Sequence, residues 1–175
     1  MRTTRLLFAL MASIFALTLA PSNASAIWKA KFGYKRYFDQ RTENLFRLEL
    51  GNDYKIAGPV HINVENAHEI NNHLYLGQIA LGLMLRFRVA KPLEITFRSD
   101  FIFDIGYQFK NGQDAFYGLG GLFGPGLAIK IVGNFGINLE VTAEVGKWLG
   151  IDDYLPPTTT RRLFWSMNFV AGFEF

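Results

Sequence analysis

Two long segments of alternating residues constrain the fold of this chain more than any other feature. From Leu93 to Phe109 the odd positions are apolar or aromatic except for Ser99, whereas charged residues such as Arg98 and Asp104 occupy even positions. From Tyr75 to Val89 the odd positions are again apolar or small. A period of two predicts a β-strand, because helical spacing would scatter the charges around a cylinder. Each segment therefore predicts a strand with one apolar and one polar face.

The same alternation predicts eight strands. They cover residues 28–38, 44–51, 54–65, 74–89, 93–110, 115–131, 135–148 and 162–175. The turn between the second and third strands lies at Gly51-Asn52-Asp53 or at Ala57-Gly58-Pro59, and both positions preserve the alternation around them. An even number of antiparallel strands can close into a barrel in which each strand is paired on both sides. We therefore expect an all-β protein that folds as a closed antiparallel eight-stranded β-barrel.

The first 26 residues have the features of a cleaved secretory signal peptide. Arg2 and Arg5 precede an apolar segment over residues 6–20, and Ala24-Ser25-Ala26 is a cleavage site of the small-x-small type. The apolar segment is shorter than the ~20 residues of a membrane-spanning helix, which argues against an uncleaved anchor. We expect a mature chain with one domain, residues 27–175. The sequence contains no Cys, which excludes disulfides and a lipid anchor on cysteine.

The charge of the mature chain is close to balanced. The loss of Arg2 and Arg5 reduces the 18 basic residues to 16, against 15 acidic residues. A net charge near +1 is no basis for contact with the phosphate backbone of DNA or RNA. We expect a monomer that binds no nucleic acid.

The last predicted strand, residues 162–175, carries aromatic residues on one face. Trp165, Phe169, Phe173 and Phe175 share this face, and polar residues take most of the alternate positions. This segment resembles the final strand of bacterial outer-membrane β-barrel proteins, and the chain resembles small barrels of the OmpA and OmpX kind. The resemblance implies a closed antiparallel eight-stranded transmembrane β-barrel in a Gram-negative outer membrane. It also implies contact with the lipids and lipopolysaccharide of that membrane, and recognition of Phe173 and Phe175 by the barrel assembly machinery.

The connections between predicted strands alternate in length. Lys91-Pro92 and Gly133-Asn134 are tight turns. Longer or more polar connections cover residues 39–43, 66–73, 111–114 and 150–161. Short turns of such barrels are periplasmic and long loops extracellular, so we expect both mature termini in the periplasm.

Charged residues of both signs fall on the face that would line the barrel interior. An eight-stranded barrel has room inside only for side chains or one small ligand, and an unpaired buried charge is costly. We therefore expect a plug of ion pairs, with a narrow aqueous channel as an alternative. The expected network consists of Arg47, Glu49, Arg86, Arg88, Glu94, Arg98, Asp100, Asp104, Glu140 and Glu144.

The predicted sixth strand is rich in glycine, with Gly118, Gly120, Gly121, Gly124 and Gly126 close together. No helix follows, which argues against a phosphate-binding loop. Four of these glycines lie on the interior face, where we expect them to make room for the arginines opposite. A small ligand cavity beside this strand is the alternative.

Some outer-membrane enzymes that acylate or deacylate lipid A are similar to this chain in size and strand number. Their chemistry relies on a hydroxyl nucleophile and a histidine base near the outer rim, a role that would fall to His61 or His73. The sequence contains no His-x-Ser pair of the deacylase kind. We therefore identify no catalytic residue and expect no cofactor.

The remaining candidate for chemistry is a group of possible metal ligands, which we place on one outer loop: Glu65, His68, Glu69 and His73. Imidazole and carboxylate groups are ligands for divalent ions, but the spacing matches no helix-based zinc motif. A solvated polar loop is the alternative. These residues are weak candidates, and we predict no metal centre.

The predicted fourth to sixth strands have about 16 to 18 residues, more than the ~9–11 that cross a membrane. The excess would project outside the cell, and a free sheet edge there would be a route to adhesion. Our leading prediction is a non-enzymatic barrel with a plugged polar interior and a structural or adhesive role at the cell surface. The alternatives are a lipid A acyl hydrolase or acyltransferase and, third, a narrow channel.

Overall fold

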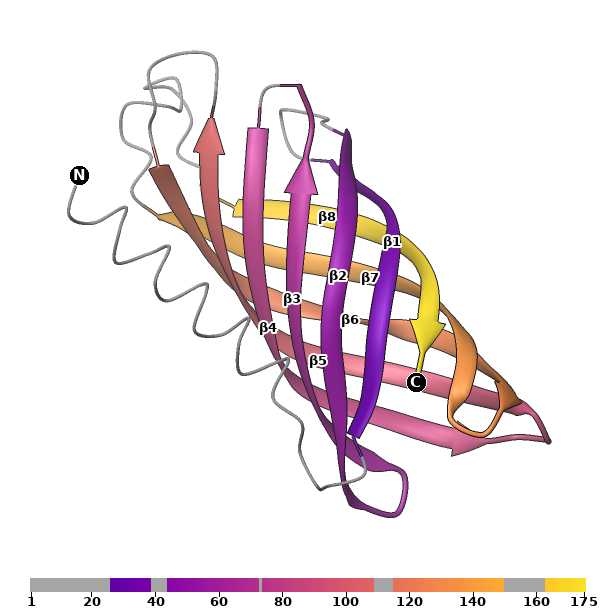
Figure 1. Cartoon of the computed structure of the whole chain (residues 1–175). Helices are drawn as coiled ribbons and strands as arrows, with labels where there is room; N and C mark the ends of the chain where they lie inside the picture. Colours follow the sequence, from indigo (N-terminus) through magenta and orange to yellow (C-terminus); the bar gives the residue numbers. More distant parts are fainter. Residues whose placement is uncertain (1–25, 39–43, 73, 109–114, 150–162) are drawn as a thin grey trace.

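In the computed structural model, the chain forms a closed barrel of eight antiparallel β-strands (Figure 1). The structure describes residues 26–38, 44–72, 74–108, 115–149 and 163–175. The strands are β1 (Ala26–Tyr37), β2 (Asn44–Ala57), β3 (Val60–Ile70), β4 (Leu74–Arg88), β5 (Leu93–Gln108), β6 (Ala115–Val132), β7 (Phe135–Leu149) and β8 (Leu163–Glu174). The predicted fold class and the number of strands are confirmed. Among the described residues, no helix is long and apolar enough to cross a membrane.

The barrel closes where β1 pairs with β8. Their register runs from Lys29 opposite Glu174 to Tyr37 opposite Ser166. Beyond this ladder, the backbone groups of Trp28 and Phe175 exchange hydrogen bonds of 3.1 and 2.9 Å. Every described strand is therefore paired on both sides, which removes the open edge of a flat sheet.

The three longest predicted strands are indeed long. β4, β5 and β6 have 15, 16 and 18 residues. The outer edges of this group are paired close to their ends, since Tyr75 of β4 lies opposite Ile70 of β3, and Tyr117 of β6 lies opposite Leu149 of β7. The expectation of a projecting sheet with a free edge is therefore wrong for the described residues.

The second hairpin turns at Gly58 and Pro59. Gly58 has a φ of 54°, in the left-handed region that glycine adopts without steric cost. Of the two predicted positions, the turn at Ala57-Gly58-Pro59 is confirmed. The position at Gly51-Asn52-Asp53, and with it the boundaries at 51 and 54, is wrong, because β2 continues to Ala57. In that triplet Asp53 is fully buried and contributes to the interior. A polar Gly-Asn-Asp sequence resembles a turn, yet here it is strand that faces a polar lumen.

Three other connections can be compared with the sequence. The turn predicted at Lys91-Pro92 is confirmed, because β4 ends at Arg88 and β5 begins at Leu93. The turn at Gly133 and Asn134 is confirmed, with a φ of 58° at Gly133. The expected outer loop over residues 66–73 is wrong in most of its length, because β3 continues to Ile70. The expected loops over residues 39–43, 111–114 and 150–161 lie outside the described residues.

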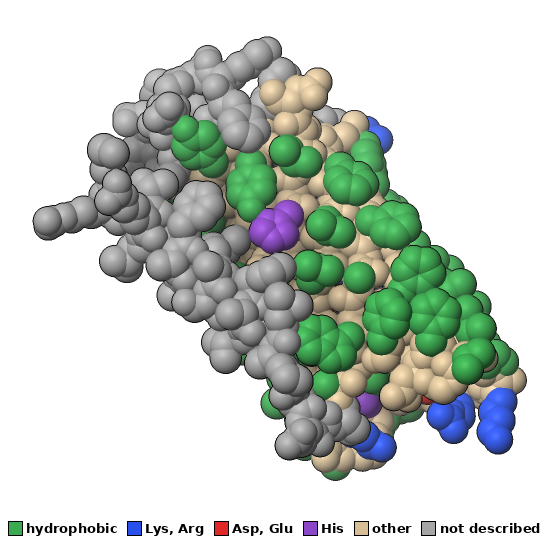
Figure 2. All heavy atoms as spheres, viewed as in Figure 1, with side chains coloured by type: hydrophobic (Ala, Val, Ile, Leu, Met, Phe, Trp, Pro, Cys, Tyr) green, Lys and Arg blue, Asp and Glu red, His purple; other side chains and the backbone are tan. Residues whose placement is uncertain are grey.

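The outer surface of the barrel is apolar. Phe97, Phe101, Leu81 and Phe169 are each about half exposed, with fractions of 48, 59, 54 and 48%. Figure 2 shows hydrophobic side chains spread over the visible face, on which acidic side chains are almost absent. An apolar outside around a polar inside is the reverse of a soluble protein and typical of a membrane-spanning barrel.

Candidate functional site

The barrel interior holds most of the charged side chains of the described residues. Strand alternation places them there, because every second side chain points inward. All Asp and Glu side chains of the described residues are buried: Glu49, Asp53, Glu65, Glu69, Glu94, Asp100, Asp104, Glu140, Glu144 and Glu174. Six basic side chains are buried with them: Lys29, Lys31, Lys35, Arg47, Arg86 and Arg98.

The first cluster of charges lies at the end of the barrel that carries the hairpin turns. The Arg86 guanidinium donates to both carboxylate oxygens of Glu174 at 2.8 Å, and also to Glu94 and Asp53 at 3.0 Å. The Lys130 ammonium lies 2.5 Å from the same Glu174 carboxylate. The arginine thus joins strands on opposite sides of the lumen.

The second cluster lies in the middle of the barrel around Lys31. Its Nζ lies 2.6 Å from Glu49, 3.0 Å from Glu65 and 2.8 Å from Glu140. Arg98 lies 2.7 Å from Glu65 and 3.1 Å from Glu140, so two cations share these carboxylates. Burial of such charges is tolerated only when each has a close partner, and here each has several.

The same three carboxylates are the one group of the described residues whose spacing would suit a metal ion. One oxygen each from Glu49, Glu65 and Glu140 lies within 4.8 Å of the others. The Lys31 ammonium, however, lies within 3.0 Å of all three side chains. A positive charge from the protein itself therefore takes the position that a cation would need.

The third cluster lies beyond Lys31, farther from the hairpin turns. Lys35 lies 2.5 Å from Glu144 and 3.0 Å from Glu69. Arg47 contacts Glu69 as well, and donates to Gln78 at 2.7 Å. Neutral donors complete this cluster, since Asn168 and Ser166 donate to Glu144 at 2.8 and 3.1 Å.

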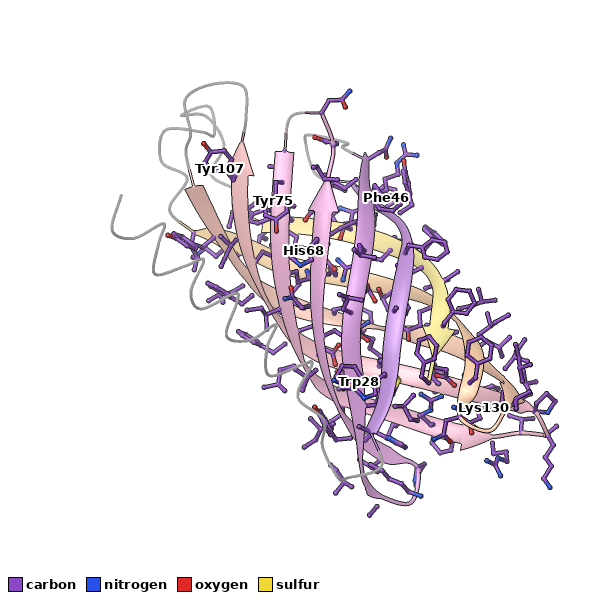
Figure 3. All side chains as sticks on the ribbon, viewed as in Figure 1. Trp28, Phe46, His68, Tyr75, Tyr107 and Lys130 are labelled. Atoms are coloured by element: carbon purple, nitrogen blue, oxygen red, sulfur yellow. The ribbon has the colours of Figure 1, made fainter. Side chains whose placement is uncertain are left out.

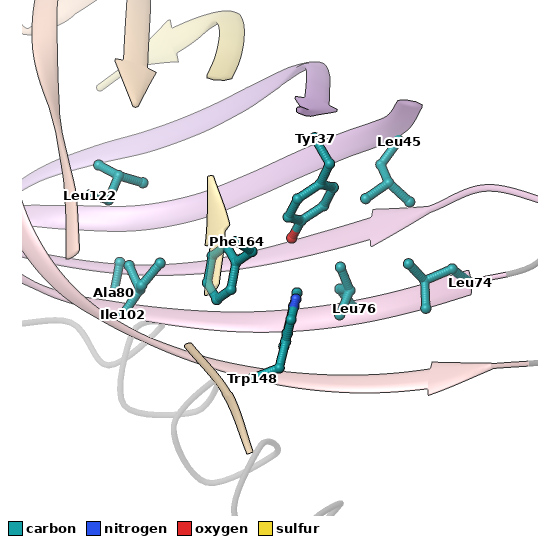
Figure 4. Packing of buried hydrophobic residues seen from close by; sticks show 9 residues of the cluster. All are labelled: Tyr37, Leu45, Leu74, Leu76, Ala80, Ile102, Leu122, Trp148 and Phe164. Atoms are coloured by element: carbon teal, nitrogen blue, oxygen red, sulfur yellow. The ribbon is translucent and has the colours of Figure 1, made fainter. Parts of the chain in front are cut away.

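An apolar cluster follows at the end opposite the hairpin turns, where aromatic rings meet inside the barrel (Figure 4). The rings of Trp148 and Phe164 lie 4.3 Å apart, and Tyr37 lies about 6 Å from both. Leu45 and Leu76 are fully buried beside them. We call Tyr37, Leu45, Leu76, Trp148 and Phe164 the aromatic cap.

Of the glycines in β6, Gly118 makes room for this cap, and none has an arginine as its nearest neighbour. A Cβ atom added to Gly118 would come within 2.8 Å of the Trp148 ring. A Cβ atom on Gly126 would instead meet the side chains of Thr96 and Glu140. The expectation that arginines occupy this space is therefore wrong, since the nearest atoms belong to other residues.

Most residues of the predicted network lie inside the barrel. Those with buried side chains are Arg47, Glu49, Arg86, Glu94, Arg98, Asp100, Asp104, Glu140 and Glu144. Arg88 is the exception and corrects the prediction: its side chain is 65% exposed and lies 3.7 Å from Glu94. Arg88 occupies a position whose side chain, by strand alternation, would point towards the interior. It is, however, the last residue of β4, so its side chain extends into the solvent beyond the rim of the barrel.

Several interior residues were missed by the sequence analysis. Asp53, Glu69 and Gln78 contribute to the clusters, and Trp148 and Phe164 to the aromatic cap. Trp148 could have been found from the alternation of its strand, because it occupies an even-numbered position like the interior residues Glu140 and Glu144. Asp53 was missed because one of the two possible turns lay there, and Glu69 because it was assigned to the expected loop over residues 66–73.

The expected constellation of Glu65, His68, Glu69 and His73 does not form in the described residues. Glu65 and Glu69 face the lumen, whereas His68 lies on the outer face. There its Nδ1 atom lies 2.6 Å from the Tyr75 hydroxyl (Figure 3). His73 lies outside the described residues.

The other candidate histidine, His61, lies in the lumen near the hairpin turns. It is 6% exposed and stands opposite Met84 in the β3–β4 ladder. The longer connections were expected at the opposite end of the barrel. An enzyme site at the outer rim would lie at that opposite end, away from His61. Among the described residues, no serine or threonine hydroxyl forms a hydrogen bond with a histidine.

An apolar depression of about 630 Å³ lies beside the glycine-rich strand. It is lined by Phe32, Pro125, Leu139, Phe169 and Ala171, among others. Phe32, Leu139 and Phe169 are exposed on the outer surface, so the depression opens outward rather than into the lumen.

Comparison with known proteins supports the fold. No protein-family model matches the sequence. No curated protein matches it either. Among solved structures, Neisserial surface protein A (NspA) has a TM-score of 0.64 at 12% identity, over 85% of this chain and 95% of that one. Ail, the attachment invasion locus protein of Yersinia pestis, solved with a heparin analogue, has a TM-score of 0.50 at 11% identity, over 86 and 99%. The chain therefore has the fold of small eight-stranded outer-membrane barrels.

Proposed function

We propose that this protein is an integral outer-membrane barrel with a plugged interior and a structural or surface role, without catalysis or conduction. The observation that supports this proposal is the succession of buried charged and aromatic side chains along the lumen. Three clusters of ion pairs, centred on Arg86, Lys31 and Lys35, are followed by the aromatic cap. In a barrel of this size such side chains leave little space for water or ions to pass.

The apolar outer surface supports the membrane location. A cleaved signal peptide over residues 1–26 would deliver the domain of residues 27–175 to the periplasm. The turns at Gly58–Pro59 and Gly133–Asn134 lie at the same end as the start of β1 and the end of β8. Since short turns in such barrels are periplasmic, both mature termini would be periplasmic.

The proposed partners follow from this placement. The exposed aromatic and aliphatic side chains would contact outer-membrane lipids and lipopolysaccharide. Phe173 and Phe175 would be recognised by the barrel assembly machinery, after which the protein would remain a monomer. A surface or adhesive role is supported by the fold shared with a surface protein and an attachment protein. It can be tested by the attachment of bacteria with and without the gene to cultured cells.

Conductance in planar lipid bilayers tests the plug. The mature protein, shown to be folded by its heat-modifiable migration on gels, should produce no current steps above background. A variant that combines Lys31→Ala, Glu65→Ala, Arg98→Ala and Glu140→Ala empties the middle of the lumen and should be leakier if it folds. Regular steps from the unaltered protein would overturn the proposal.

The competing function is an enzyme that adds or removes an acyl chain of lipid A. Such an enzyme would change the mass of lipid A. It requires a nucleophile beside His61 or His73 at the outer rim. His61 lies at the other end of the lumen, which does not favour it. Mass spectra of lipid A from cells with and without the protein should be identical. Loss or gain of an acyl chain that His73→Ala abolishes would establish the enzyme instead.

A further inference from the structure

The exposed charged side chains of the described residues are all basic. Every Asp and Glu side chain among them is buried in the lumen, as described above. Lys55, Arg88 and Lys91 are exposed at the end with the hairpin turns. Arg36 and Lys147 are exposed towards the opposite end. Figure 2 shows Lys and Arg side chains gathered along the lower edge of the barrel.

Each hairpin at the turn end pairs a cation with an exposed apolar side chain. Ile56 is 56% exposed next to Lys55 in the first of these hairpins. Val89, 60% exposed, follows Arg88 in the next one. In the third, Val132 is 73% exposed close to Lys130. We call the first two pairs together with Lys91 the basic rim: Lys55, Ile56, Arg88, Val89 and Lys91.

The acidic side chains nearest to the basic rim are already engaged. Glu174 accepts hydrogen bonds from Arg86 and lies 2.5 Å from Lys130. Glu94 also accepts from Arg86, at 3.0 Å, and is the only acidic neighbour of Arg88 among the ion pairs of the described residues. The positive charge of Lys55, Arg88 and Lys91 therefore remains available to an external anion.

We propose that the basic rim binds the headgroups of anionic phospholipids such as phosphatidylglycerol. This inference rests on the proposed function, since it requires that the barrel spans a membrane. The rim continues the apolar outer band, so Ile56 and Val89 would enter the edge of the acyl layer. The long Lys and Arg side chains would then reach the phosphate level, as basic residues at membrane interfaces do. In the proposed orientation this is the periplasmic leaflet.

The charge of the lipid distinguishes this binding from simple membrane contact. A cation near an anionic lipid surface gains about 1 kcal/mol, which is about fivefold in local lipid concentration. A zwitterionic lipid such as phosphatidylcholine carries no net charge and lacks this gain. The basic rim therefore predicts enrichment of anionic over zwitterionic lipid at the turn end.

Quenching of tryptophan fluorescence by brominated lipids tests the proposal. The substitution Phe87→Trp places a reporter on the outer face next to Arg88, where Phe87 is 43% exposed. Trp28→Phe and Trp165→Phe remove the other outward tryptophans. Trp148 stays, because its ring lies inside the lumen, out of reach of the lipid chains. The protein is reconstituted in phosphatidylcholine vesicles that contain about a quarter brominated phosphatidylglycerol or, for comparison, brominated phosphatidylcholine.

We expect brominated phosphatidylglycerol to be enriched about fivefold at the reporter, and the enrichment to fall in high salt. The triple variant Lys55→Gln, Arg88→Gln, Lys91→Gln should lose the enrichment. The matched control Arg36→Gln, Lys147→Gln, which alters the opposite end, should retain it. Equal quenching by the two lipids, or enrichment that survives the triple variant, would overturn the proposal.

The two proposals fail in different ways. Heat-modifiable migration after reconstitution in pure phosphatidylcholine reports membrane insertion alone. If the protein does not insert there or in the mixed vesicles, the membrane barrel itself is wrong. If it inserts normally but shows no preference for phosphatidylglycerol, only the basic rim is wrong.

Discussion

Arg86 and Glu174 face each other across the lumen, with the Nη2 atom of the arginine 2.8 Å from both carboxylate oxygens. Their strands, β4 and β8, are not neighbours in the barrel wall. This contact therefore adds a connection that the backbone ladder does not supply. It also places the arginine where Glu94 and Asp53 converge, so that one guanidinium donates hydrogen bonds to three carboxylates.

Replacement of Arg86 should destabilise the barrel strongly. Arg86→Met would leave buried carboxylates without their main partner, which costs about 3–5 kcal/mol in the free energy of unfolding. Urea titration in lipid vesicles, followed by tryptophan fluorescence, measures the loss. Arg88→Met is the matched control, because Arg88 is exposed and its ion pair contributes about 0–1 kcal/mol. Similar losses in the two variants would contradict the network described here.

The close approach of Gly118 to Trp148 predicts a second pair of variants. Gly118→Ala would push its methyl group against the indole ring and cost about 1–3 kcal/mol through overpacking. Gly121 lies in the same strand, but the nearest atom to an added Cβ there is 3.7 Å away. Gly121→Ala should therefore be close to neutral in the same urea titration. The reverse order of stabilities would show that the aromatic cap is not packed as described.

Arginine scanning of the outer face tests the depth of the barrel in the membrane. Phe101 is 59% exposed in the middle of β5, and Phe101→Arg should cost about 2–4 kcal/mol. Val132 lies at the turn end, where Val132→Arg should cost only about 0–1 kcal/mol because the interface is near. The free energy of unfolding in vesicles gives both values. A barrel that does not span the bilayer would show no such dependence on position.

The role proposed for Phe175 can be separated from its place in the fold. Its backbone would still bond to Trp28 in Phe175→Ala, so unassisted folding into detergent micelles should be unchanged. In cells, the fraction of folded protein in the outer membrane should fall several-fold if the side chain is an assembly signal. Trp165→Ala, which removes an exposed aromatic from the other end of β8, should leave assembly intact. An equal defect in both variants would indicate a general loss of membrane contact.

The number of strands and their faces could be predicted from the sequence. The alternation of side chains along a strand is a local property, so Arg98 and Asp104 indicated the interior without knowledge of any partner. The same parity would have placed Trp148 in the lumen, had it been followed to the end of the strand. The second hairpin was left with two possible turns because polar residues such as Asp53 are common both in turns and on strands that face a polar interior.

The sequence by itself determined that the chain forms eight strands, each with one apolar and one charged face. Closure into a barrel follows, because it turns all the apolar faces outward and buries all the charged faces inside. Only the tertiary structure decided which charges meet. Lys31 and Glu140 are 109 residues apart, and their contact depends on strand register and on the distance across the lumen. The same register carries Arg88 past the rim while Arg86, two residues earlier, stays inside. Position along the barrel axis is a property of the closed sheet, and no local pattern encodes it.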